Sequence, residues 1–278
     1  MARASAETES GAGSAGRRGP GHNPDRRQTL VERYRAARRD PSLVVIEGLH
    51  ALRHALRFGA EPIEVLTSDP AGVDRLAREL AADVADRIRA LARPIDGDTL
   101  AQLTPAPIHT GVIALAPRPA QDIRAALDDP RSAPVVFLEA PANAYNLGAI
   151  VRIAAAADAA ALLATGKHDP WNPGSVRAGA GLQFALPVAR VDALPPNDRP
   201  LVALDPDGDV VAPDEIPARA VLAFGTERYG LSDDIVRNAA LRVRIPMRAG
   251  VSSLNLATSA AAVLYAMRWG REAGSARG

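Results

Sequence analysis

The feature that most constrains the fold is the alternation of short apolar runs with helical segments in the second half of the chain. Apolar runs typical of buried strands occupy residues 135–138, 161–164, 201–204, 221–224 and 243–245. Helical patterns occupy residues 147–157, 173–179, 233–238 and 254–269. Because parallel strands need crossover connections and helices supply them, this order predicts a parallel α/β sheet covered on both faces. Ligands of such sheets bind outside the carboxyl ends of the strands.

The first half of the chain predicts a smaller α/β domain. Strands are expected at residues 43–46, 63–66 and 112–116, and helices at residues 29–39, 49–58 and 73–82. Prolines then punctuate a linker that holds one short helix at residues 121–127. The predicted organisation is a disordered basic tail (1–28), an α/β domain (29–118), a linker (119–134), the larger domain (135–272) and a flexible tail (273–278).

Composition removes several classes of function. The 278 residues include no cysteine, which excludes disulfides, cysteine-ligated zinc and a thiolate nucleophile. The most apolar stretch, residues 153–164, contains Asp158 and is too short to span a bilayer. The N-terminus has no apolar core of a secretion signal. A cytoplasmic protein without a membrane segment is therefore expected.

Positive charge is concentrated near the N-terminus, although the formal net charge is only +1. Between residues 17 and 39 the only acidic residues are Asp25 and Glu32. The arginines of this tract are Arg17, Arg18, Arg26, Arg27, Arg33, Arg35, Arg38 and Arg39. A basic end on a near-neutral chain suits contacts with phosphate. A solvated arginine-rich tail is the competing interpretation, and the charge pattern alone leaves both open.

The first cluster of candidate functional residues follows the strand at residues 135–138. In it, Asn146 can cap the following helix, Gly148 permits close backbone approach, and Arg152 lies about a turn and a half further on. A helix start near an arginine suits a phosphate or a developing alkoxide. Taken alone, a capped helix with a surface arginine explains the same pattern.

The second cluster, residues 224–232, has the glycine spacing of a phosphate-binding loop. Leu231 replaces the lysine that such a loop requires, which excludes binding of a nucleoside triphosphate. What remains is a turn between glycines that presents Glu227 at the end of a strand.

The third cluster, residues 245–255, leads from an apolar strand through a glycine turn into a long helix that begins near Ser253. A helix cap explains this serine, and the glycines of a serine-hydrolase elbow are missing.

Two weaker patterns are rejected as metal sites. His50 and His54 are one helical turn apart after Glu47, but the internal glutamate of a zinc-protease motif is missing. The acidic run from Asp205 to Asp209 lacks the closing glutamate of a calcium loop, and a turn is expected there. No metal site is predicted.

Taken together and in order, the three clusters resemble the motifs of the SpoU (TrmH) family of RNA ribose methyltransferases. The motifs correspond to residues 146–154, 224–232 and 245–255, and residues 172–181 resemble a further family segment. Residues 46–66 resemble, less sharply, the small substrate-binding domain of members that modify ribosomal RNA. The sequence departs from the family pattern at Ile153, Asp158 and Gly179.

The resemblance implies a SPOUT fold, in which the C-terminal part of the parallel sheet is threaded into a deep trefoil knot. It further implies that the knot loops bind S-adenosylmethionine and that two subunits form a homodimer. The residues implied for the methyl donor are Ala223, Phe224, Gly225, Glu227, Ile245, Pro246, Met247, Ser253 and Leu254.

By the same resemblance, the catalytic residues are Asn146, Arg152, Glu227, Ser253 and Asn255. Because the free guanidinium pKa is above about 12, we expect Arg152 to bind phosphate and stabilise the alkoxide rather than to act as a base. Asn146 would fix Arg152 or the ribose, Glu227 would orient Arg152 or groups on the donor side, and Ser253 and Asn255 would complete the network.

RNA affinity would come from the N-terminal domain and its arginines, and the residues predicted for it are Arg33, Arg35, Arg38, Arg39 and Arg53. Only RNA carries the 2′-hydroxyl, so DNA is not an expected substrate. Structured ribosomal RNA is favoured by the separate N-terminal domain. Two alternatives stay open at this point: methylation of tRNA ribose or of a base, and a non-catalytic RNA-binding or ribosome-assembly protein on the same fold.

Overall fold

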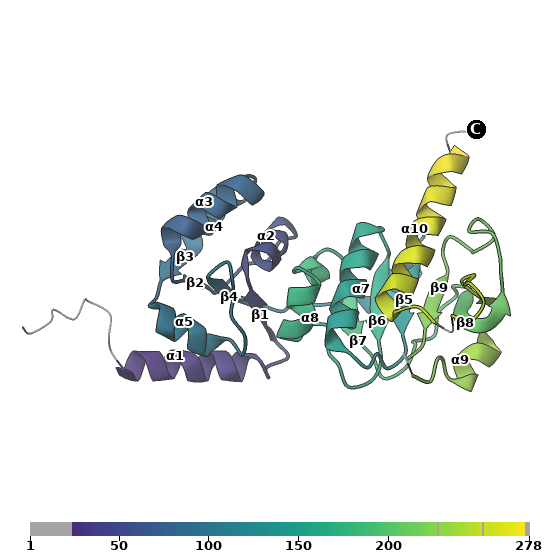
Figure 1. Cartoon of the computed structure of the whole chain (residues 1–278), viewed down its shortest axis with the longest axis horizontal. Helices are drawn as coiled ribbons and strands as arrows, with labels where there is room; N and C mark the ends of the chain where they lie inside the picture. Colours follow the sequence, from purple (N-terminus) through teal and green to yellow (C-terminus); the bar gives the residue numbers. More distant parts are fainter. Residues whose placement is uncertain (1–23, 227, 252, 276–278) are drawn as a thin grey trace, which may run out of the picture.

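The chain forms two sheets, each with its own helices (Figure 1). The structure is a computed structural model that describes residues 24–226, 228–251 and 253–275. The strand order is β1-β4-β2-β3 in the smaller sheet and β10-β8-β9-β5-β6-β7 in the larger one. The predicted α/β class is confirmed. The tail predicted at residues 1–28 lies mostly outside the described residues, and the chain is already helical from Pro24.

The smaller sheet is mixed, because β1 and β2 pair antiparallel with β4 whereas β2 and β3 pair in parallel. Its strands are β1 (Leu43–Glu47), β2 (Glu64–Thr67), β3 (Ala92–Pro94) and β4 (Val112–Pro117). The accompanying helices are α1 (Pro24–Ala37), α2 (Leu49–Arg57), α3 (Pro70–Leu80), α4 (Ala85–Leu91) and α5 (Gly97–Leu103). The elements α4, β3 and α5 were not predicted, because they are short and weakly patterned.

The larger sheet is parallel throughout, as predicted. Its strands are β5 (Val135–Leu138), β6 (Ala161–Ala164), β7 (Val188–Arg190), β8 (Leu201–Asp209), β9 (Val221–Phe224) and β10 (Leu241–Val243). The helical segments are α6 (Ile123–Asp128), α7 (Ala144–Ala156), α8 (Pro173–Ala178), η1 (Leu182–Phe184), α9 (Asp233–Asn238) and α10 (Leu256–Ser275). The threading of the C-terminal segment into a trefoil knot stays a prediction.

Two strands differ from the sequence prediction in ways that matter for the site. The acidic run expected to be a turn is the second half of β8, which continues to Asp209. The last strand is β10, two residues earlier than predicted, so residues 244–255 form the connection to α10. Both shifts arise because β10 pairs with β8 across an irregular register between Arg242 and Val243.

A buried carboxylate joins the two halves of the chain. Glu47, at the end of β1, is 5% exposed and pairs with Arg38 next to α1 at 2.6 Å and with Arg177 of α8. The Arg38 guanidinium also donates to the carbonyl of Leu103 at 2.6 Å. Nearby, the backbone of α2 lies so close to Gly181 that any side chain at this position would overlap it. In Figure 1, α2 and α8 accordingly lie at the junction of the two sheets.

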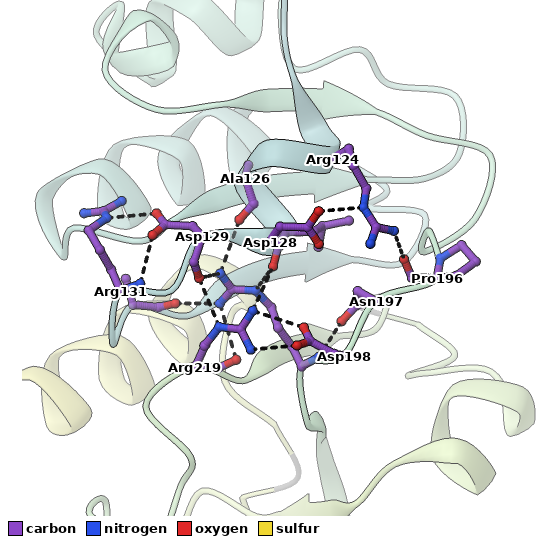
Figure 2. Close-up of polar contacts among 12 residues, drawn as sticks. Arg124, Ala126, Asp128, Asp129, Arg131, Pro196, Asn197, Asp198 and Arg219 are labelled. Carbon is purple, nitrogen blue, oxygen red and sulfur yellow. Dashed lines mark hydrogen bonds and ion pairs between the residues drawn. The ribbon is translucent and has the colours of Figure 1, made fainter.

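A second buried charge fixes the opposite end of the larger sheet. Arg199 is 5% exposed, and its guanidinium donates to the carbonyls of Ala126, Leu127, Asp129, Ala133 and Arg219 at 2.7–3.3 Å. These carbonyls end α6 and precede β5 and β9. Figure 2 shows the surrounding ion pairs, in which Asp129 holds Arg131 and Asp198 holds Arg219. Arg199 thus connects the linker helix to the edge where the strands begin.

None of the helices in the described part of the chain has the length and apolar character needed to cross a bilayer.

Replacing Arg199 with Met tests this interpretation of the buried guanidinium. The substitution leaves several buried carbonyls without donors, so we expect the free energy of unfolding to fall by about 3 kcal/mol or more. Urea denaturation of the purified protein measures the change. The matched control is Arg124→Met, which removes an exposed i,i+4 ion pair with Asp128 and should cost less than about 1 kcal/mol. Equal effects of the two substitutions would contradict the role given to Arg199.

Candidate functional site

A pocket lies where β9 ends, beside the middle of β8, and where the chain leaves β10. Four separate segments line it, and their residues are Leu204, Asp205, Pro206, Phe224, Gly225, Thr226, Gly230, Val243, Arg244, Ile245, Met247, Ser253, Leu254, Leu256 and Ser259. The parallel register aligns these segments, because Leu204 and Leu138 both pair with Phe224 of β9. The pocket therefore occupies the edge of the sheet that the sequence predicted for ligand binding.

Most residues predicted for the methyl donor lie in this pocket. Those that line it are Phe224, Gly225, Ile245, Met247, Ser253 and Leu254. Two predicted residues do not line the pocket. They are Ala223, which is fully buried within β9, and Pro246, which is exposed. Glu227 falls outside the described residues. The apolar walls suit an aromatic base, and the few polar groups would fix its orientation.

The loop after β9 closes on itself in a way that explains its glycines. Thr226 and Gly230 exchange two backbone hydrogen bonds, at 2.9 and 3.1 Å, and the Thr226 hydroxyl accepts from the Tyr229 amide at 2.8 Å. A Cβ on Gly225 would overlap the backbone of Gly230, and Gly230 has a φ of +70°. The turn between glycines that the sequence predicted is present, and it forms one wall of the pocket.

The helix caps at this site differ from the prediction. The side chain that caps α7 is Asn143, which accepts from the amides of Tyr145 and Asn146, so Asn146 lies within the first turn. At α10 the capping side chain is that of Asn255 rather than Ser253, because the side-chain Oδ1 of Asn255 accepts from the backbone amides of Ala257 and Thr258. The helix start was misplaced because several residues of this stretch are good caps.

The predicted catalytic asparagines meet each other. The Asn255 Nδ2 donates to the Asn146 Oδ1 at 3.3 Å, which connects the first turn of α7 to the start of α10. Ser253, which lines the pocket, is two residues from Asn255. Residues 109 positions apart are thus held together at the mouth of the pocket. Sequence order alone could not show this contact.

Arg152 lies elsewhere on α7 and does not line the pocket. Its charge acts on α2 of the smaller sheet, where it lowers the pKa of His50, Arg53 and His54. Burial is the largest cause of each of these shifts, and neighbouring arginines add to it. The His54 Nδ1 lies 2.7 Å from the carbonyl of Ala180, which holds α2 against the turn before η1. Arg152 and α2 therefore share one surface with two arginines and two histidines, which we call the α2–α7 surface (His50, Arg53, His54 and Arg152).

Comparison with known proteins identifies the family. The sequence profile described as the SpoU rRNA Methylase family matches residues 133–265. A 23S rRNA (adenosine(1067)-2′-O)-methyltransferase of Streptomyces azureus is 30% identical over 86% of this chain and 90% of its own length. An uncharacterized tRNA/rRNA methyltransferase of Mycobacterium tuberculosis (strain ATCC 25618 / H37Rv) is 31% identical over 81% of this chain and 80% of its own length.

The chain belongs to the SpoU rRNA methylase family. The fold agrees, because the SpoU methyltransferase AviRb of Streptomyces viridochromogenes, solved with S-adenosylmethionine, superposes with a TM-score of 0.71 at 25% identity. That superposition covers 88% of this chain and 99% of AviRb. The protein is therefore an RNA methyltransferase that uses S-adenosylmethionine as the methyl donor.

The arginines predicted to bind RNA have different surroundings in this SpoU protein. Arg38 pairs with Glu47 and donates to the Leu103 carbonyl, so it has a structural role, and its contact with RNA stays a prediction. Arg33 pairs with Glu64 while remaining half exposed. Arg35 and Arg39 are exposed on and after α1, and Arg53 belongs to the α2–α7 surface. The structural role of Glu47 was not predicted. Its only signal in the sequence is an acidic residue at the end of an apolar strand.

Metal binding has no basis in the surroundings of the histidines. Glu47 is held by its two arginines, and the described residues contain no group of three or more histidine, aspartate and glutamate side chains that could hold a metal ion.

The position of Arg152 next to α2 can be tested without any assay of activity. Removing its charge with Arg152→Gln should raise the pKa of both His50 and His54, because a neighbouring cation disfavours the protonated imidazole. NMR titration of the imidazole Cε1 protons measures both values. Arg57 acts on His54 but not on His50, so Arg57→Gln should raise the pKa of His54 alone. Unchanged titration of both histidines in Arg152→Gln would contradict the described geometry.

Proposed function

We propose that this protein methylates the 2′-hydroxyl of one ribose in structured 23S ribosomal RNA. The observation that carries the proposal is the meeting of the two motif asparagines beside the pocket, with Arg152 on the same helix as Asn146. The named activity of the Streptomyces azureus relative supports the 2′-hydroxyl and the ribosomal substrate.

The chain's own residues would perform three tasks in this reaction. S-adenosylmethionine, when bound, supplies an electrophilic methyl group. Arg152 would hold an RNA phosphate and stabilise the alkoxide that forms as the 2′-hydroxyl loses its proton, because its guanidinium stays charged at neutral pH. Asn146, Asn255 and Ser253 would orient the ribose, and Glu227 would orient Arg152 or groups on the donor side. Most of the rate enhancement would come from holding the two reactants in line.

The N-terminal domain, residues 29–118, would supply affinity for RNA. The α2–α7 surface supports this role, since Arg53 of α2 lies close enough to Arg152 for the two charges to interact. Phosphate contacts of this kind carry affinity without sequence information, so the folded shape of the RNA would select the site. The exposed arginines of α1, together with Arg39, would extend the contact.

We also propose that the active form is a homodimer in the cytoplasm. Arg152 does not line the pocket of its own chain. Tyr145, next to Asn146, is 60% exposed, Val251 is 48% exposed and Leu254, in the pocket lining, is 41% exposed, and exposed apolar groups favour a protein interface. The arginine that serves this pocket would then be Arg152 of the second copy.

The proposal is tested by transfer of labelled methyl from S-adenosylmethionine to deproteinised 23S rRNA, 16S rRNA and tRNA. We expect label on a ribose of 23S rRNA, and we expect Arg152→Ala to lower kcat by about 100-fold or more through lost stabilisation of charge in the transition state. The matched control is Arg237→Ala on α9, an exposed arginine that neither lines the pocket nor belongs to the α2–α7 surface, and this variant should keep full activity.

Label in tRNA alone would overturn the substrate while keeping the chemistry. Label on a base would overturn ribose as the acceptor. Donor binding without transfer to any RNA would favour a non-catalytic RNA-binding protein on this fold.

A further inference from the structure

We propose that Asp205 accepts hydrogen bonds from the ribose hydroxyls of the methyl donor, and so selects the nucleoside part of S-adenosylmethionine. The proposal rests on the donor pocket described above. It concerns a residue outside the three motifs, in an acidic run that the sequence predicts to be a turn without function.

The position of Asp205 is set by the register of the sheet. Leu204 pairs with Phe224 at the end of β9, and Asp205 is the next residue of β8. It lines the same pocket as Phe224, Gly225 and Ile245. Asp205 lies within β8, one residue past the level at which β9 ends, and the carboxyl ends of parallel strands are where such folds commonly bind nucleotides.

Asp205 is the residue of the pocket lining that carries a carboxylate, and most of the other lining residues are apolar or neutral. Its side chain is only 14% exposed, and an ionised carboxylate buried without partners is unfavourable. Two contacts hold the side chain in place. The Asp205 Oδ2 accepts from Arg242 Nη2 at 2.9 Å, and the Oδ1 accepts from the Asp207 amide at 2.9 Å. Asp205 is thus a fixed hydrogen-bond acceptor in the lining of the pocket.

The ion pair is not arranged for stability alone. A guanidinium that stabilises a carboxylate best does so through two parallel N–H groups. Here a single Arg242 nitrogen reaches Asp205, and the Arg242 Nε is buried without a hydrogen-bond partner among the described residues. The pair therefore leaves acceptor capacity on the carboxylate unused by the protein.

The unused capacity matches a pair of adjacent hydroxyls. Each carboxylate oxygen has about two lone-pair sites, and the protein occupies one on each oxygen. Two acceptors side by side complement the 2′- and 3′-hydroxyls of one ribose. The adenine amine and the amino group of the methionine part each present their donors from one nitrogen, whereas the two hydroxyls match the two carboxylate oxygens one to one.

The experiment is isothermal titration calorimetry with S-adenosylhomocysteine and its 2′-deoxy and 3′-deoxy derivatives. Wild-type protein should bind at least one deoxy derivative about tenfold or more weakly, since a hydrogen bond to a charged acceptor is lost. Asp205→Ala should bind S-adenosylhomocysteine weakly and should barely distinguish it from the deoxy derivatives. The matched control is Asp207→Ala, an exposed acid on the same strand, which should behave as wild type because its backbone amide is unchanged.

A fourth ligand separates the ribose from the amino-acid part. 5′-Methylthioadenosine keeps the ribose and lacks the amino group, so Asp205→Ala should weaken its binding as much as that of S-adenosylhomocysteine. An effect confined to S-adenosylhomocysteine would overturn the proposal in favour of the amino group. Equal binding of all three nucleosides by wild-type protein would overturn it without any variant, should Asp205→Ala fail to fold.

The donor pocket and the role of Asp205 fail in different ways. Wild-type protein that binds no S-adenosylhomocysteine would overturn the pocket and this proposal together. Normal binding with full discrimination in Asp205→Ala would overturn the role of Asp205 alone.

Discussion

The parallel pairing of β5 and β8 with the central strand β9 is the constraint on which the site depends. In this register Leu138 at the end of β5, Phe224 at the end of β9 and Leu204 within β8 lie at the same level. The segments that follow them therefore lie side by side, although they are far apart in the sequence. The donor pocket and the start of α7 both form at this one edge, and the connection from β10 to α10 closes it.

Two buried charges hold the framework around this edge. Glu47 joins α1, β1 and α8, and so fixes the smaller sheet against the larger one. Arg199 gathers the carbonyls at the opposite end of the larger sheet, where the linker helix meets the starts of the strands (Figure 2). Both are buried polar groups whose partners are satisfied, an arrangement that specifies one geometry. The α2–α7 surface exists because the first of these contacts places α2 next to Arg152.

Much of this could be predicted from the sequence, for identifiable reasons. The strands β5, β6 and β9 have the predicted limits because fully buried strands are continuous apolar runs. The extent of β8 was wrong, because a strand end rich in Asp and Gly has the composition of a turn and only pairing with β10 extends it. The caps of α7 and α10 were misplaced among neighbouring polar residues. The roles of Arg38, Glu47 and Arg199 depend on contacts between distant segments, which no local pattern encodes.

Amide hydrogen exchange with and without S-adenosylmethionine tests the central claim most directly, that one pocket built from four distant segments binds the donor. The account predicts slower exchange in residues 204–206, 224–226, 243–247 and 253–259, with β6 and β7 unchanged. A second groove, between the end of α2, the linker and η1, is lined by Phe58, Gln121 and Phe184. Protection confined to that groove, or no protection at the four segments, would contradict the account.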